Sequence, residues 1–207
     1  MAIKAIIWDM GGVLVRTHRR DGREKWEKAL SLPHGTLEEI VFGGESGYLA
    51  GIGSITPEQH WDWIYRHLRI PAEKQDAFTN DFWSGDEVDR DLIHFIGELQ
   101  GRYRTGLITN AWLDIRHMLE DVWGINSVFD EIIVSAEVKL VKPDEAIYRM
   151  MLEKLNVKAE ESVFVDDFLE NIEGARALGM HGIHFQQPEQ ALHDLSALLN
   201  EQAPHST

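Results

Sequence analysis

Hydrophobic positions follow two different periods along the chain, and the change between them divides it into parts. Residues 2–8 form an apolar run typical of a buried strand, but from Arg16 to about Arg90 no comparable strand signal appears. In that middle stretch apolar and aromatic residues recur at helical spacing between Gly, Pro and Ser breaks. The predicted helices there are Arg23–Leu32, Leu37–Phe42, Pro57–Leu68 and Ala72–Phe82.

After Arg90 the pattern alternates between strands and helices. The predicted strands are Tyr103–Ile108, Glu131–Val134, Ser162–Val165 and His181–Phe185. The predicted helices are Asp91–Leu99, Leu113–Val122, Asp144–Leu155, Phe168–Leu178 and Pro188–Leu199. Such alternation predicts an α/β fold with a Rossmann-like parallel sheet and crossover helices. We expect the first strand in that sheet, so that residues 1–15 and 88–207 form the core and residues 16–87 an inserted α-helical cap.

Short-range signals refine three places along the chain. Thr56, Pro57 and Gln59 form a helix start in capping-box register. Residues 43–48 are glycine-rich but lack the preceding strand and following helix of a nucleotide-binding loop, so we interpret them as a cap loop. The end of the chain, residues 202–207, is expected to be loose.

Composition narrows the classes of function. A 207-residue chain with 43% hydrophobic residues can build a core, and its net charge of -15 argues against binding a nucleic-acid backbone. No segment reaches the roughly 18 apolar residues of a membrane span, and neither export nor membrane insertion is indicated. The absence of cysteine fits a reducing compartment, so a cytoplasmic location is the default expectation. The oligomeric state is left open.

Polar residues follow the predicted strands at their carboxyl ends. Asp9 closes the first apolar run and precedes Met10, Gly11 and Gly12. Two later strands are followed by further polar residues, namely Thr109 and Asn110, and the pair Asp166 and Asp167. Lys142 lies in a loop before a predicted helix. Because parallel strands share one carboxyl edge, these side chains are expected to converge, with Lys142 reaching over from its loop.

The charge of this set calls for a cation. Asp9, Asp166 and Asp167 bring three negative charges and Lys142 returns one, so the group repels itself or takes up protons unless a divalent cation joins it. Oxygen ligands alone favour magnesium, Mg²⁺.

The order of these motifs resembles the haloacid dehalogenase-like hydrolase superfamily, and specifically its Mg²⁺-dependent phosphatases with a helical cap inserted after the first motif. The resemblance spans almost the whole chain. It implies Asp9 as the nucleophile, Thr109 as a phosphoryl-binding hydroxyl and Lys142 as the balancing charge. It implies Asp167 as a direct metal ligand and Asp166 as a partner through water.

The same resemblance implies a mechanism. Asp9 would also be a metal ligand, and the backbone carbonyl of Gly11 would be another. The phosphate oxygens would be bound by Thr109, Lys142 and backbone amides of Gly11 and Asn110, with Gly12 allowing a close approach of the backbone. An aspartyl-phosphate would form and be hydrolysed by water. The substrate is expected to be a small phosphorylated metabolite.

One position departs from the family pattern. Most phosphatases of the family carry a second Asp two residues after the nucleophile as the general acid, whereas this chain has Gly11. General acid–base help contributes about two to four orders of magnitude. Three explanations stay open: a preference for good leaving groups, a proton from a cap residue or water, or feeble catalysis. His18 is the nearest titratable candidate, although an exposed position on the linker is the favoured interpretation.

Two alternative functions are kept. Dehalogenation of a 2-haloacid could use the same nucleophile without metal, but the Asp166–Asp167 pair argues against it. A non-catalytic phosphate-binding regulatory protein could have lost turnover together with the acid, and Gly11 is the support for that reading.

Other tempting groups receive structural interpretations. His60 and His67 flank Trp61, Trp63 and Tyr65, and the tryptophans are expected to pack within the cap in preference to forming a metal or stacking site. A further basic set just past the nucleophile is read as a solvated face at the hinge, in preference to a site for an anionic tail of the substrate. Its members are Arg16, Arg19, Arg20 and Arg23.

Overall fold

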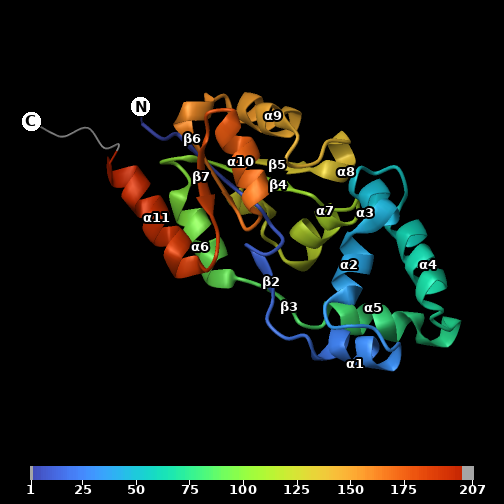
Figure 1. Ribbon diagram of the computed structural model, residues 1–207. Helices are drawn as coiled ribbons and strands as arrows, with labels where there is room; N and C mark the ends of the chain where they lie inside the picture. Colours follow the sequence, from blue (N-terminus) through green and yellow to red (C-terminus); the bar gives the residue numbers. More distant parts are fainter. Residues whose placement is uncertain (1, 202–207) are drawn as a thin grey trace, which may run out of the picture.

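A five-stranded parallel sheet forms the centre of the computed structural model, which describes residues 2–201 (Figure 1). Its order is β5-β4-β1-β6-β7. The strands are β1 (Ala5–Trp8), β4 (Arg104–Thr109), β5 (Glu131–Val134), β6 (Ser162–Asp166) and β7 (His181–His184). The prediction that the first strand joins the later ones is confirmed, because β1 pairs in parallel with both β4 and β6. The predicted α/β fold is likewise confirmed.

Alternate residues of β1 enter different hydrophobic cores on the two faces of the sheet. Ile6 and Trp8 belong to one cluster, whereas Ala5 and Ile7 belong to the other, as the period of two in a strand requires. The first face is covered by α6 (Arg90–Leu99) and α11 (Pro188–Glu201). The second is covered by α9 (Glu145–Leu155) and α10 (Leu169–Ala177). Helices on both faces leave the ends of the strands as the accessible edge of the sheet.

A two-stranded antiparallel ribbon connects this core to a group of helices. It consists of β2 (Val15–Thr17) and β3 (Asp86–Val88), with Val15 paired to Val88 and Thr17 to Asp86. Thr17 Oγ1 also donates a hydrogen bond of 2.7 Å to Asp86 Oδ1. The expectation that residues 16–90 contain no strand is therefore wrong, because three-residue strands of mixed polarity leave no clear period in the sequence.

Between β2 and β3 lies a helical insertion, which forms a separate lobe beside the sheet (Figure 1). Its helices are α1 (Asp21–Ala29), α2 (Thr36–Phe42), α3 (Gly44–Gly51), α4 (Pro57–Leu68) and α5 (Gln75–Trp83), with the short η1 (Ala72–Lys74) before α5. They enclose their own hydrophobic core, in which Trp26, Ile64 and Phe78 are buried. The predicted capping box at the start of α4 is confirmed, with both Thr56 and Gln59 side chains bonded to backbone N–H groups.

The glycine-rich segment at residues 43–48 is not the loop that was expected, because α3 begins at Gly44. The N–H of Gly43 donates to Glu39 O and ends α2. A Cβ on Gly47 would lie 2.7 Å from the carbonyl oxygen of Phe42. These glycines therefore allow α2 and α3 to pack closely, and their role is structural.

Histidine and tryptophan residues of α4 have different environments. His60 is fully buried, with Nε2 donating to Val41 O at 2.9 Å and Nδ1 accepting from Ser46 Oγ at 2.8 Å. Burial lowers the pKa of His60. Trp61 packs against the insertion core, as expected, but Trp63 is exposed and stacks on His67, so cap packing was wrong for Trp63.

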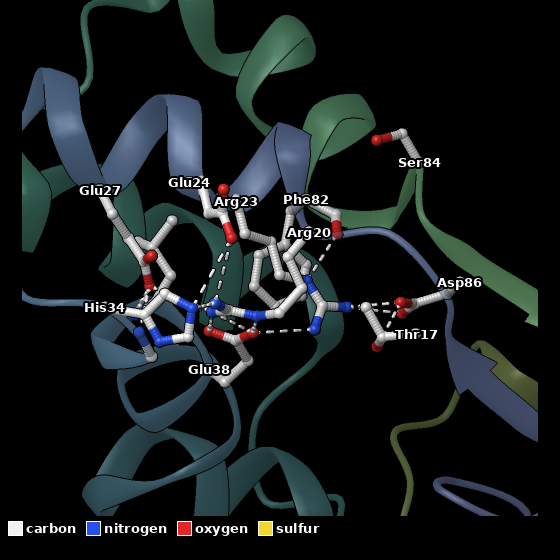
Figure 2. A network of polar contacts seen from close by, with 12 residues as sticks. Thr17, Arg20, Arg23, Glu24, Glu27, His34, Glu38, Phe82, Ser84 and Asp86 are labelled. Atoms are coloured by element: carbon white, nitrogen blue, oxygen red, sulfur yellow. Dashed lines mark hydrogen bonds and ion pairs between the residues drawn. The ribbon is translucent and has the colours of Figure 1, made fainter.

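The basic residues of the hinge form a network of ion pairs between α1, α2 and the ribbon (Figure 2). Arg23 is buried, binds both carboxylate oxygens of Asp86 at 2.7 Å and lies over the ring of Phe82. Arg20 binds Glu38 at 2.8 and 2.9 Å. The solvated face predicted here is wrong for Arg20 and Arg23, because acidic partners distant in sequence compensate both charges.

Two further arginines of the hinge, Arg16 and Arg19, lie outside this network. Arg16 pairs with Asp89 at 2.6 Å, and Arg19 is exposed. Arg19 donates a long hydrogen bond of 3.4 Å to the backbone oxygen of Ser84. The solvated position predicted for this set is therefore confirmed for Arg19.

The segment predicted as one helix at residues 113–122 is broken. It contains α7 (Ile115–His117) followed by a π-helical turn, η2 (Met118–Val122). Further short elements are η3 (Asn126–Val128), α8 (Ser135–Val138) and η4 (Ala159–Glu161). No helix within residues 2–201 is long and apolar enough to cross a membrane. The tail predicted to be loose, residues 202–207, lies outside the described residues.

Candidate active site

Three neighbouring strands bring polar residues to one edge of the sheet. Asp9 follows β1 directly, and its backbone N–H donates to Val165 O at 2.9 Å. Asp166 ends β6, and Thr109 ends β4. The strand register places Asp166 level with Asp9, and Thr109 one residue further along. Asp9, Thr109 and Asp166 are all buried, so the sheet fixes their positions through its own hydrogen bonds.

Lys142 joins this group from the loop before α9. Its Nζ lies 2.6 Å from Asp9 Oδ1 and 2.7 Å from Asp166 Oδ2, and its side chain is 1% exposed. Asn110 fixes the backbone of that loop, because its side-chain amide accepts from Lys142 N at 2.8 Å and donates to Lys142 O at 3.0 Å. The ammonium is therefore held between two buried carboxylates.

Asp166 and Asp167 differ in how many partners they have. Asp166 accepts from Lys142, from the backbone N–H of Phe168 at 2.8 Å and from Asn171 Nδ2 at 3.0 Å. Asp167 Oδ1 is buried and has no hydrogen-bond partner among the described residues. A buried carboxylate oxygen without a donor is costly unless a cation binds it.

Three carboxylates offer oxygens close enough for one metal ion. One oxygen each of Asp9, Asp166 and Asp167 lies within 4.8 Å of the others. Burial, opposed by Lys142 and reinforced by Asp166, raises the pKa of Asp9 to about 7. Burial and the charge of Asp166 raise the pKa of Asp167 to about 6. Hard oxygen donors with raised pKa values fit a divalent cation such as Mg²⁺.

The glycines after Asp9 have unequal space around them. Gly12 has φ +76°, and a Cβ built on it would lie 2.1 Å from Asp167 Oδ2. A Cβ on Gly11 would meet nothing within 4 Å. Gly12 is therefore required for the approach of its loop to Asp167, whereas the structure leaves room for a side chain at position 11.

This difference predicts that alanine at position 12 destabilises the protein, whereas alanine at position 11 has little effect. Gly12→Ala should lower the free energy of unfolding by at least about 2 kcal/mol, since a left-handed backbone alone costs about 1–2 kcal/mol and the Cβ also displaces Asp167. Gly11→Ala should change it by about 0.5 kcal/mol or less. Urea denaturation followed by circular dichroism measures both. Equal losses in the two variants would contradict this account of the turn.

Several contacts around the site were not predicted from sequence. His184, at the end of β7, donates from Nε2 to Asp167 O at 2.9 Å. Ser135 Oγ accepts from Ala111 N at 3.0 Å and donates to Gly51 O at 2.6 Å, so it ties the loop after Asn110 to the insertion. His184 carried a detectable signal, because it lies one residue before the end of the predicted strand His181–Phe185, at the same sheet edge.

His18 stands apart from this group in the fold. It follows β2 on the side of the insertion, its side chain is exposed, and its backbone N–H donates to Gly85 O at 2.8 Å. This is the exposed linker position favoured from sequence.

Two known proteins align with all or most of this chain. It is 32% identical over 226 residues to Bifunctional epoxide hydrolase 2 of Mus musculus, an alignment that covers 100% of this chain but only 40% of that protein. It is 29% identical to Sesquiterpene phosphatase astK of Aspergillus oryzae, with 87% of this chain and 89% of that protein covered.

A solved structure shares the fold of this chain, and a family model matches most of its sequence. The structure is that of the enzyme bt-2542 from Bacteroides thetaiotaomicron, in complex with magnesium and inorganic phosphate. It superposes on this chain with a TM-score of 0.71 at 23% identity, and the match covers 89% of this chain and 95% of that one. The sequence model for haloacid dehalogenase-like hydrolases matches residues 3–179. The chain therefore belongs to the haloacid dehalogenase-like hydrolase family.

Proposed function

We propose that this hydrolase is a Mg²⁺-dependent phosphatase that acts on a small phosphomonoester through an aspartyl-phosphate. The observation that carries the proposal is the arrangement of Lys142 between Asp9 and Asp166, beside the unpartnered oxygen of Asp167. The names of the Aspergillus relative, a phosphatase, and of the Bacteroides complex with magnesium and phosphate support it.

Asp9 is the nucleophile of the proposed reaction. Its carboxylate oxygen forms a bond to phosphorus while the ester P–O bond breaks, and the alcohol leaves with that electron pair and takes up a proton. Water then attacks the aspartyl-phosphate and releases inorganic phosphate and the free carboxylate. Thr109, Lys142 and the backbone N–H groups of Gly11 and Asn110 bind the phosphate oxygens.

Asp9, Asp167 and the Gly11 carbonyl would hold Mg²⁺, with Asp166 contributing through water. The ion supplies positive charge that cancels repulsion between the carboxylate and a phosphate dianion. Asp166 is already bonded to Lys142, Phe168 and Asn171, which supports the less direct role for it.

Gly11 decides which leaving groups are favoured. The chain has no carboxyl group at this position to protonate a departing alkoxide, and the open space around Gly11 admits water there. Acid help is worth about 10²–10⁴-fold, so esters of acidic alcohols are expected to be hydrolysed fastest.

The experiment that tests the function is a substrate panel. Aryl, acyl and sugar phosphates are incubated with the purified protein in Mg²⁺ and in excess chelator, and released phosphate is measured. We expect Mg²⁺-dependent turnover of aryl and acyl phosphates. Chloride release from a 2-haloacid in chelator would favour a dehalogenase instead. Tight binding of beryllofluoride without any turnover would favour a phosphate-binding regulatory protein.

Domain roles form part of the proposal. Residues 1–15 and 88–207 form the catalytic core, and residues 16–87 form a cap over the site, which excludes water during the first step and admits it for the second. The absence of cysteine supports a cytoplasmic location.

A further inference from the structure

Three aromatic rings meet where the helical insertion touches the core. Phe42 ends α2, Trp83 ends α5, and Trp112 lies in the core loop after β4. Their ring centroids are 5.8 Å (Phe42–Trp83), 6.3 Å (Phe42–Trp112) and 6.2 Å (Trp83–Trp112) apart. These three residues, which we call the aromatic triad, are distant in sequence but form one continuous surface.

The aromatic triad is open to solvent although it adjoins a hydrophobic core. Phe42 is 51% exposed and Trp83 is 37% exposed. Single exposed aromatic residues are ordinary, whereas adjoining ones contributed by separate segments form a candidate ligand-binding surface. Its position at the junction between core and insertion is where small-molecule sites commonly form.

One member of the aromatic triad lies next to the proposed phosphate site along the chain. Trp112 lies two residues after Asn110, so their Cα atoms are at most about 7 Å apart. The loop between them is fixed, because Ala111 N donates to Ser135 Oγ and Trp112 O accepts from Ile115 N at 3.2 Å. This short separation places the Trp112 backbone within reach of a ligand whose phosphate lies at Asn110 and Lys142, and the remaining atoms of that ligand need a surface at the junction of core and insertion.

Two polar side chains beside the rings are already bonded within the protein. Both nitrogens of His60, which packs against Trp112, are bonded to Ser46 and Val41. The hydroxyl of Ser84, next to Trp83, donates to Asp81 O at 2.8 Å. Hydroxyl groups placed here would lose water without gaining these partners, whereas hydrocarbon would gain from burial.

We propose that the aromatic triad binds the alcohol part of the substrate and that this part is an apolar hydrocarbon, not a polyhydroxylated sugar. The inference rests on the proposed phosphatase function, because it takes the phosphate group to lie at Lys142. The aromatic rings contribute stacking and burial to the substrate's apolar end.

Non-hydrolysable phosphonates test this without requiring turnover. Isothermal titration calorimetry in Mg²⁺ compares methylphosphonate, heptylphosphonate and the phosphonate analogue of glucose 6-phosphate. Heptylphosphonate should bind at least about tenfold more tightly than either of the others, since each buried methylene contributes favourably. Equal affinities for the methyl and heptyl compounds, or tighter binding of the sugar analogue, would overturn the proposal.

Two variants and a matched control locate the effect. Phe42→Ala and Trp83→Ala should each lower the ratio of heptyl to methyl affinity by about tenfold. Trp63→Ala removes an equally exposed tryptophan of the insertion that contacts His67 instead, and should leave the ratio unchanged. An unchanged ratio in both triad variants would reject the assignment.

The same measurements separate this inference from the function on which it rests. Failure to hydrolyse any phosphate in Mg²⁺, with the heptyl preference intact, would refute the phosphatase and leave the apolar site. Turnover of aryl phosphate without a preference for heptylphosphonate would support the phosphatase and refute the apolar site.

Discussion

Asp9→Asn should lower kcat for Mg²⁺-dependent hydrolysis of p-nitrophenyl phosphate by about 10⁴-fold or more, the scale seen when a covalent nucleophile is lost. The amide has nearly the same shape as the carboxylate but cannot attack phosphorus. Because Asp9 lies 2.6 Å from Lys142 in a buried group, the change removes one charge without removing packing. Initial rates at saturating substrate measure it.

A matched control changes an aspartate at the other end of the strands, where their amino ends lie. Asp130 precedes β5, pairs with Arg104 at 2.9 Å and accepts from Thr105 N at 2.8 Å. Asp130→Asn should alter kcat by about twofold or less, since it lies outside the candidate site.

Mass spectrometry after acid quenching should find a phosphoryl group on the wild-type protein. Activity of Asp9→Asn within tenfold of wild type would exclude Asp9 as the nucleophile.

Lys142→Met should lower both stability and activity. The side chain keeps its length but loses the ammonium between Asp9 and Asp166, and breaking a buried ion pair typically costs about 3–5 kcal/mol. Loss of one electrostatic contact to the transition state should lower kcat by about 10²–10³-fold. Urea unfolding in chelator and steady-state kinetics in Mg²⁺ measure these two effects.

The stability loss in Lys142→Met should depend on pH. Without the ammonium, the pKa of Asp9, already about 7, rises further, so the folded state binds protons that the unfolded state releases. Stability then falls as pH rises, and the deficit should be larger at about pH 8 than at about pH 5. Lys154→Met removes a half-exposed lysine that pairs with Glu131 at 3.0 Å, and should cost under about 1 kcal/mol. Equal costs at the two lysines would contradict a buried role for Lys142.

The core was predictable because its periods are strong and local. Long apolar runs and helical spacing identified the strands and helices around Asp9 and Asp166. The rule that parallel strands share a carboxyl edge then placed them together. Lys142 was singled out because it precedes a predicted helix in a loop near the same edge, and the resemblance to the family gave it the balancing charge.

Features that depend on tertiary contact could not be predicted in this way. Trp112 is one aromatic residue in a loop, and no period shows that its ring enters a cluster formed by residues 29 to 86 positions earlier. The pairing of Arg23 with Asp86 joins positions 63 residues apart, so the basic run looked solvated. Gly44 and Gly47 resembled a loop because composition does not reveal close helix packing.

The helical insertion contacts the core at three places that are far apart in sequence. They are the paired ribbon, where Thr17 and Asp86 are joined, the hydrogen bond from Ser135 to Gly51, and the contact of Trp112 with His60. Because the chain enters and leaves the insertion through the ribbon, the first contact joins both of its ends. The other two contacts can separate while the ribbon stays paired, so we expect an opening of the insertion to release Ser135 and Trp112 before Thr17 and Asp86.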